Sequence, residues 1–235
     1  MSDERDRREL RDRWGTGGFV FAMQPALESV FKNKNSKGAV DLRGIAVGLE
    51  GPIDWLVWTD LQGVRLENTD FGFAKFSCSF IRGQFRAVRF TGSEFDTCRF
   101  AMAHFVEVDF AQSLLLAPWL EDAIFTDCRF HGARIRARSK SIANSSGSRI
   151  KFEWCDFMDS TWDRISMAGV DFIDCHFEAA RFRECQVFNW RFKGQTPTRE
   201  QFIKCQYRGK NIGPALPRRA GGRPNGLWCD SNESP

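Results

Sequence analysis

Residues 78–135 read CSFIR GQFRA VRFTG SEFDT CRFAM AHFVE VDFAQ SLLLA PWLED AIFTD CRFHG ARI. Every fifth residue is large and apolar, from Phe80 to Ile135, and a smaller side chain stands two residues before each, from Cys78 to Ala133. An α-helix repeats its apolar face at three and four residues and a flat strand at two, so a period of five fits neither. A chain that turns a corner every five residues can point both of these side chains inward. Because no single unit buries them alone, the units must stack as the coils of a solenoid.

The same period extends on both sides of this stretch. It begins near residue 59, and the step from Phe76 to Phe80 is four, so one residue has been dropped there. After Ile135 the period lapses for seventeen residues and returns at Phe152 for nine further units. The large position is apolar in all 25 regular units, and phenylalanine fills 17 of them. The chain has 23 phenylalanines and one tyrosine, which indicates a dry slot without a partner for a phenol hydroxyl.

Charge and cysteine usage narrow the class of protein. The net charge of +4 is uneven, since residues 134–151 carry +6 and residues 208–223 carry +5, both without an acid, which leaves −7 for the remainder. Six of the eight cysteines occupy the small position of the period, as compact apolar fillers do. The N-terminus lacks the apolar segment of a signal peptide, and the apolar cluster at residues 114–120 is too short to span a bilayer. These features predict a cytoplasmic protein without membrane association.

Four units have a small residue followed by Asp and then by Leu or Phe, namely Val40-Asp41-Leu42-Arg43-Gly44, Thr69-Asp70-Phe71, Val108-Asp109-Phe110 and Val170-Asp171-Phe172. They resemble the motif of the pentapeptide-repeat family, which is a small residue, then Asp or Asn, then Leu or Phe, then two variable positions. The resemblance covers roughly residues 38–194. It implies an all-β fold, a right-handed quadrilateral β-helix with four pentapeptides per coil. The 25 units then correspond to about six coils, roughly 30 Å of rod at about 4.8 Å per coil. Trp190 occupies a small position, so we expect the coil to widen or end there.

We divide the chain into three parts. Residues 1–37 form an N-terminal arm and capping segment, in which residues 24–31 are expected to form a short helix over the open end of the solenoid, with Pro25 in its first turn. Residues 38–212 form the pentapeptide-repeat β-helix, interrupted at 136–151, and residues 199–212 close it either as a last coil or as a helix. Residues 213–235 are rich in Pro, Gly, Arg and Ser and are expected to be a disordered tail.

Motifs that carry chemistry are missing from the sequence. There is no phosphate loop, nucleophile elbow or dinucleotide fingerprint. His104, His131 and His176 stand beside large core positions and so point outward on different coils. We therefore predict a non-enzyme with no catalytic residues, no cofactor and no metal site. Cys78 with Cys98, and Cys155 with Cys175, are expected to stack on neighbouring coils, about 4.8 Å apart at Cα and within reach of a disulfide. A reduced thiol ladder is favoured over disulfides in a cytosolic core.

Two surface features are candidates for partner binding. The first is an apolar patch at outward positions of two adjacent coils, namely Met102, Val106, Leu114, Leu116, Trp119 and Ile124. Such a patch fits a protein partner or a homodimer contact, and an N-terminal segment folded back onto it is the alternative. The second is the basic loop with Arg136, Arg138, Lys140 and Arg149, which fits phosphate or an acidic protein surface, or serves only to solubilise.

These observations favour a non-catalytic protein-binding scaffold whose partner is unknown. The resemblance implies an alternative, because quinolone-resistance proteins and the mycobacterial gyrase inhibitor of this family mimic duplex DNA and bind type II topoisomerases. A body of −7 that is interspersed with arginines is a poor copy of a phosphate backbone. Direct nucleic-acid binding through the basic loop and tail is disfavoured further, because the aromatic residues are used in the core and few remain for base stacking.

Overall fold

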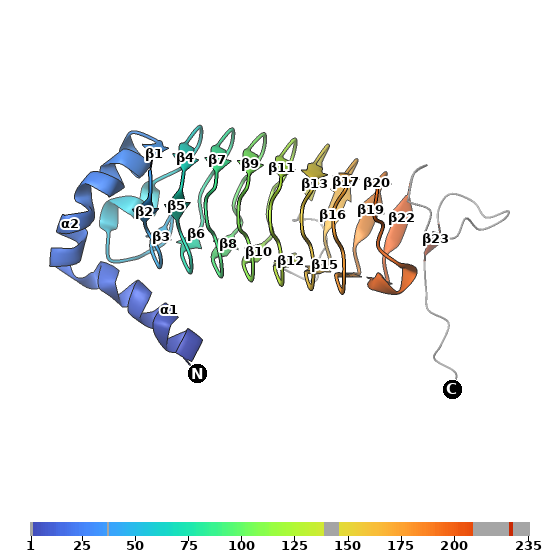
Figure 1. The fold of residues 1–235 in the computed structure, drawn as a ribbon, viewed down its shortest axis with the longest axis horizontal. Coiled ribbons are helices and arrows are strands. Elements are labelled where there is room, and N and C mark those ends of the chain that lie inside the picture. The colour runs from blue at the N-terminus through green and yellow to red at the C-terminus, as the bar shows by residue number, and fades with distance from the viewer. Residues whose placement is uncertain (1, 37, 139–145, 209–225, 228–235) are drawn as a thin grey trace.

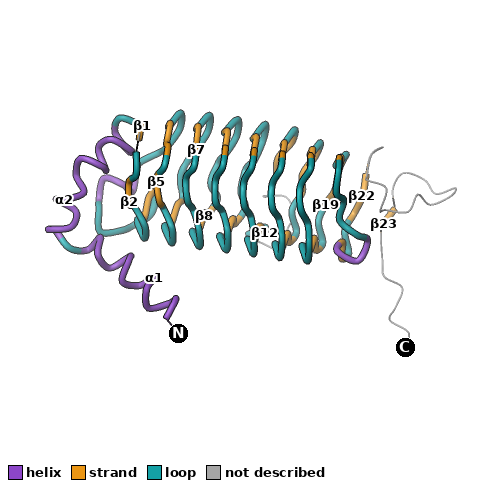
Figure 2. Tube along the Cα trace, in the orientation of Figure 1, coloured by secondary structure: helices purple, strands orange, loops and turns teal. Residues whose placement is uncertain are grey.

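The computed structural model describes residues 2–36, 38–138, 146–208 and 226–227. The chain forms a straight rod of stacked coils, with helices gathered at the N-terminal end (Figure 1). Figure 2 shows that short strands alternate with turns along every coil. Within these residues the helical segments are α1 (Ser2–Asp12), η1 (Arg13–Gly15), α2 (Gly17–Leu27), the π-helical segment η2 (Glu28–Lys32), η3 (Asp54–Trp58) and η5 (Arg199–Gln201).

The rod has four faces, which we name A to D in the order in which the chain visits them. Face A is an eight-stranded parallel sheet: β1 (Asn35–Ser36), β4 (Arg65–Glu67), β7 (Gln84–Arg86), β9 (His104–Val106), β11 (Ile124–Thr126), β14 (Lys151–Glu153), β17 (Asp171–Ile173) and β20 (Arg191–Lys193). Face B begins with the parallel pair β2 (Val40–Asp41) and β5 (Thr69–Asp70). It continues as single bridges from Asp70 through Arg89 to His176.

Faces C and D complete each coil. Face C is the second eight-stranded sheet: β3 (Ala46–Val47), β6 (Lys75–Phe76), β8 (Glu94–Asp96), β10 (Leu114–Leu116), β12 (Arg134–Arg136), β15 (Thr161–Asp163), β18 (Arg181–Arg183) and β21 (Phe202–Ile203). Face D starts with bridges that join Ser79, Arg99 and Trp119. It continues as the parallel strands β13 (Ser146–Ser148), β16 (Ser166–Ala168), β19 (Gln186–Phe188) and β22 (Gln206–Arg208), to which β23 (Gly226–Leu227) pairs in the antiparallel sense.

The strand register explains both irregularities of the five-residue period. Phe105 pairs with Phe125, twenty residues further on, as four units of five require. Phe76 pairs with Phe95, only nineteen residues away, so the predicted loss of one residue before Phe80 is confirmed. Phe125 pairs with Phe152 at a separation of 27, which is one ordinary coil plus seven residues. The lapse in the sequence is therefore one coil with a seven-residue insertion.

The core consists of columns of stacked aromatic rings inside the wall. On face A, Phe105 stacks on Phe85 and on Phe125 with ring centroids 4.7 Å apart in both cases. On face B, Phe110 stacks on Phe130 at 5.0 Å. Among the described residues, 21 that are not glycine lie in the left-handed region with φ near +55°, nearly all of them in the turns between faces. Each such residue costs about 1–2 kcal/mol, so the wall holds its corners only because the stacked core and the hydrogen bonds between coils fix them.

The N-terminal end of the rod is closed by the helices. Leu27, Val30 and Phe31 are buried, and the ring of Phe31 lies 6.5 Å from that of Phe71. The helix is longer than expected, since α2 begins at Gly17 and Pro25 lies inside it near the C-terminal end rather than in its first turn. The prediction that Pro25 lies in the first turn of the helix was therefore wrong, because the apolar residues before Pro25 already belong to α2. The first coil, β1 to β3, was not counted among the 25 regular units because the period is interrupted between it and residue 59, where η3 lies, and the rod has about seven turns rather than about six.

The C-terminal end shows a second correction at Trp190. Strands β21 and β22 continue the stack beyond it, so the coil does not end there. Trp190 is fully buried, and its indole N–H donates to the Met167 carbonyl at 3.0 Å. Room for the indole exists because Met167 and Val187 replace phenylalanine at large positions on face D. Residues 199–208 form a closing coil. Apart from β23, the tail expected to be disordered lies outside the described residues, as does Ile212.

Candidate functional site: the wall around Trp119

Face D carries an exposed aromatic residue in the middle of the rod. Trp119 is 45% exposed and lies beside Arg99 of the preceding coil. Met102 is 39% exposed and occupies the turn between faces D and A, where its backbone N–H donates to the Glu121 carbonyl at 2.8 Å. Ala101 is almost fully buried on the same stretch of wall. Trp119 and Met102 are thus two exposed apolar residues at the centre of the rod, one on face D and one at its edge with face A, whereas the 57% exposed Trp154 lies in the turn that follows β14 on face A.

The other four residues of the expected apolar patch lie on different faces. Val106 is on β9 and Ile124 on β11, both on face A, where Val106 pairs with Thr126. Leu114 and Leu116 are on β10, on face C, which is the opposite side of the rod. All four are half-buried. The period separated outward from inward positions, but it does not say which of four faces an outward residue joins.

The insertion that interrupts the repeat lies between β12 on face C and β13 on face D. On the entering side, the Arg138 guanidinium bonds the Asp96 carboxylate at 3.0 Å, crossing β10. On the returning side, Arg149 bonds Glu121 at 3.0 Å and Asp122 at 2.6 Å. The hydrogen bonds with Asp122 raise the pKa of Arg149 and lower that of Asp122. Two of the predicted loop cations therefore attach the insertion to the wall, Arg136 stays exposed on β12, and Lys140 lies outside the described residues.

The N-terminal segment packs on another edge of the rod. The carbonyl of Leu10 lies against Gly44, the Arg7 guanidinium lies 5.1 Å from the centre of the Phe73 ring, and Arg11 bonds Glu94 at 2.9 Å. These contacts follow the edge between faces B and C in the first coils. They leave the Trp119 surface on a different edge from the N-terminal segment.

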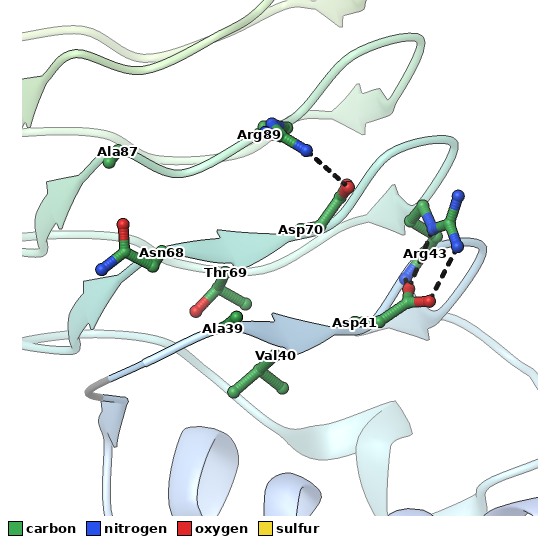
Figure 3. Close-up of a pocket in the computed structure, with 9 residues that line it drawn as sticks. All are labelled: Ala39, Val40, Asp41, Arg43, Asn68, Thr69, Asp70, Ala87 and Arg89. Atoms are coloured by element: carbon green, nitrogen blue, oxygen red, sulfur yellow. Dashed lines mark hydrogen bonds and ion pairs between the residues drawn. The ribbon is translucent and has the colours of Figure 1, made fainter.

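Face B carries a column of alternating charge with a shallow groove of about 630 Å³ at its N-terminal end. Figure 3 shows Asp41 facing Arg43, and Asp70 facing Arg89, along this groove. The pKa of Asp41 would be raised by its burial, but hydrogen bonds from Arg43 and Arg13 outweigh that effect and hold it well below its usual range. Further along the column, Asp109 bonds Arg129. The charged side chains that line this groove thus form ion pairs with one another.

The described cysteines have a structural role in the wall, and the described residues form no cluster of metal ligands. The seven described cysteines are free thiols, and burial raises the pKa of Cys155 well above the ordinary value. Cys155 is in hydrogen-bonding contact with both Cys128 and Cys175, so the stack includes one cysteine more than the sequence predicted. Within the described residues no group of three or more His, Cys, Asp or Glu side chains is placed to hold a metal ion. No helix in this part of the chain is long and apolar enough to cross a membrane.

One coil is completed by four five-residue units, whose large residues are Phe105 on face A, Phe110 on face B, Leu115 on face C and Leu120 on face D. Residue 125 then returns to face A beside Phe105. The chain has the pentapeptide-repeat fold. The resemblance seen in the sequence is confirmed for the fold by this arrangement. The carboxylate at the second position of a repeat also has a structural role, since Asp109 accepts the N–H of Ala111 at 2.9 Å and caps the turn.

Comparison with known proteins gives solved structures only, since no family model and no curated protein matches the sequence. Full-length QnrB1, a plasmid-mediated fluoroquinolone resistance protein, is 17% identical over 71% of this chain and 81% of that chain, with a TM-score of 0.39. HetL, a pentapeptide repeat protein involved in heterocyst differentiation regulation from Nostoc sp. strain PCC 7120, is 13% identical over 79% and 91%, with a TM-score of 0.30. Rfr23, a pentapeptide repeat protein from Cyanothece 51142, is 14% identical over 72% and 97%, with a TM-score of 0.25. Likeness at this level concerns the pentapeptide-repeat fold and no partner.

The pentapeptide-repeat wall also brings together residues that the sequence did not connect. Arg134 and Arg181 both face Thr161 on face C, and Arg183 faces Asp163 beside them. They flank the inward residues Ile135 and Phe182, so their outward direction was readable from the period. Their shared face was not, because the length of the insertion between them had to be known first.

Proposed function

We propose that this pentapeptide-repeat protein is a non-catalytic, cytoplasmic scaffold that binds a protein partner through face D around Trp119. The exposure of Trp119 beside Met102 is the observation that carries the proposal. Tryptophan is strongly enriched among the residues that dominate binding energy at protein interfaces. The free thiols of the described core support a reducing compartment.

The rigidity of the wall supports a docking role. Two backbone hydrogen bonds fix Trp119 to the preceding coil, since its N–H donates to the Cys98 carbonyl at 3.0 Å and its carbonyl accepts from the Phe100 N–H at 2.7 Å. The core beneath is stacked aromatic and aliphatic side chains. A surface that is already ordered loses little conformational freedom on binding, so more of the contact energy appears as affinity.

Mimicry of duplex DNA, with a type II topoisomerase as partner, is the alternative that the family resemblance raises. It needs a face of continuous negative charge. On face B the acids alternate with Arg89 and Arg129, and on face C the central strand β12 carries Arg134 and Arg136. This distribution favours the general scaffold. A purified-protein assay of gyrase supercoiling separates the two, because inhibition or protection at stoichiometric concentration would support mimicry.

The experiment that tests the proposal compares the tagged wild-type protein with Trp119→Ser and with Trp58→Ser. Trp58 is 90% exposed at the N-terminal end of the rod and serves as the matched control. Proteins captured from the native host are identified by mass spectrometry, produced in pure form and titrated by calorimetry. We expect one purified partner whose affinity falls at least about tenfold with Trp119→Ser, which corresponds to about 1.4 kcal/mol, and is unchanged with Trp58→Ser.

Two other outcomes of the comparison between wild type and Trp119→Ser would change the conclusion. If wild-type protein sediments as a dimer and Trp119→Ser sediments as a monomer, the partner at face D is a second copy of the chain. If every purified partner binds Trp119→Ser as tightly as wild type, face D is not the docking surface and the proposal fails.

A further inference from the structure

The C-terminal half of face C carries four exposed arginines that no other described residue neutralises. Arg134 and Arg136 extend from β12, and Arg181 and Arg183 extend from β18, two strands further along. Among the described residues, none of the four takes part in an ion pair or a side-chain hydrogen bond. We call these four residues the arginine patch.

The acids on the strands of face C near the arginine patch already have partners. Asp163, on the strand between the two arginine pairs, is held by both Nε and Nη2 of Arg164, at 3.1 and 2.8 Å. Asp96, two strands below β12, bonds Arg138. Glu94 bonds Arg11 at 2.9 Å and Lys75 at 3.4 Å. The ion pairs on this face therefore leave its excess positive charge on the arginine patch.

The spacing of the patch is set by the sheet. Arg134 and Arg136 are two residues apart on one strand, which places their Cα atoms about 6.8 Å apart, and β12 lies about 9.5 Å from β18. An extended peptide presents alternate side chains on one side with the same spacing of about 6.8 Å. Leu114 and Leu116 pair with Arg134 and Arg136 and give an apolar, half-buried border.

We propose that the arginine patch binds a short, extended, acidic segment of a partner protein, with carboxylates at alternate positions. Guanidinium groups bond carboxylates through two parallel hydrogen bonds, which gives both strength and orientation. The inference rests on the scaffold function proposed above, but it concerns face C, whereas the Trp119 surface is on face D. The two surfaces can be removed separately.

The limits of the patch favour a short acidic segment over a nucleic acid. Asp96 lies on one side of it, and Glu184 follows Arg183 at the other, where a small open groove is lined by both residues. On the first side Asp96 and Arg138 neutralise each other, and on the second the Glu184 carboxylate repels an anion, so the free positive charge covers only the span of two to four carboxylates and not that of a long polyanion. The described outward positions of face C also offer no aromatic ring on which a base could stack.

The test uses a fluorescein-labelled eight-residue peptide that alternates Glu and Thr, with the Gln–Thr peptide as uncharged control. Fluorescence anisotropy is measured on the full chain in 50 mM and 300 mM NaCl. We expect the Glu–Thr peptide to bind and the Gln–Thr peptide not to bind. Affinity should fall at least about tenfold in Arg134→Glu/Arg136→Glu and in Arg181→Glu/Arg183→Glu, since each change removes two charge-assisted bonds. The control Arg65→Glu/Lys193→Glu makes the same change of charge on face A and should bind like wild type.

The outcomes distinguish the two proposals. Trp119→Ser should bind the Glu–Thr peptide as tightly as wild type does. If this variant loses a protein partner but still binds the peptide, the result bears on the docking surface of face D and leaves the arginine patch of face C in place. The acidic-segment proposal is overturned if the Glu–Thr peptide does not bind, or if the face A control weakens it as much as the face C variants. It is also overturned if a 20-base-pair duplex binds more tightly than the peptide and depends on the same arginines.

Discussion

Removal of one ring from the middle of the face A column is the sharpest test of how the rod is held together. Phe105 is fully buried and stacks on Phe85 and Phe125 at 4.7 Å on either side. Phe105→Ala should destabilise the protein by about 3–5 kcal/mol, because it loses the buried apolar surface and leaves a cavity. The upper half of that range is expected, since two stacked pairs are lost at once.

Thermal unfolding followed by circular dichroism measures this effect. At about 2–4 °C per kcal/mol for a protein of this size, a loss of about 4–5 kcal/mol in Phe105→Ala should lower Tm by roughly 8–20 °C. Phe21→Ala is the control, because Phe21 is 83% exposed and its loss should change stability by less than about 0.5 kcal/mol. Hydrogen exchange should show amides of β7 and β11 losing protection together, since both strands pair with β9. Equal Tm values for the two variants, or loosening limited to β9, would refute the reasoning.

Three further predictions concern the ends, the acids and the thiols. Gly44→Ala should release α1, because the new Cβ would lie 2.4 Å from the Leu10 carbonyl oxygen. Gly63→Ala is the control, since it has the same left-handed strain but open space around the new Cβ. Limited proteolysis after Arg8 should be faster only in Gly44→Ala, and equal rates in the two variants would contradict the contact. Burial raises the pKa of Asp109, but bonds from Arg129, Ala111 and Thr91 outweigh it and lower that pKa, so its stabilisation is full above about pH 4 and is lost as the pH falls through the folded value. Urea midpoints at pH 6 and pH 3 should therefore differ less in Asp109→Asn than in wild type, and an equal difference would count against the assignment. In Cys78→Ser/Cys229→Ser the six remaining cysteines are all buried, and burial raises the pKa of Cys155 and Cys185. Their thiols should therefore react with Ellman's reagent only slowly until urea is added, and rapid reaction of the native protein would show an open wall.

The sequence predicted the direction of side chains well because the period of five carries that information directly. Phe80, Phe105 and Trp162 are all buried as the period requires. Gly147 is an exception, since it occupies a large position on face D beside Met167, and the Ile150 side chain fills the space there. The apolar pattern does not reveal such a position, because the residue at the large position is small and a neighbouring side chain fills the space in the core.

The candidate sites were harder to predict because a surface needs the face as well as the direction. The six apolar residues share two coils, yet Leu116 and Val106 point to opposite sides of the rod. A seventeen-residue lapse also hides how many units it contains, so Arg134 and Arg181 could not be placed on one face. Ion pairs such as Arg149 with Asp122 depend on turns that only the folded wall brings together.

Alternation of inward and outward residues along each coil is the central claim, and thiol labelling measures it directly. In the Cys229→Ser background, Ala103→Cys places a thiol at a small inward position, which cysteine already fills elsewhere, and His104→Cys places one on the adjacent exposed position. The native His104→Cys protein should react rapidly with Ellman's reagent, whereas the thiol of Ala103→Cys should be protected until the protein unfolds. Equal rates for the two variants, or faster reaction of Ala103→Cys, would contradict the alternation.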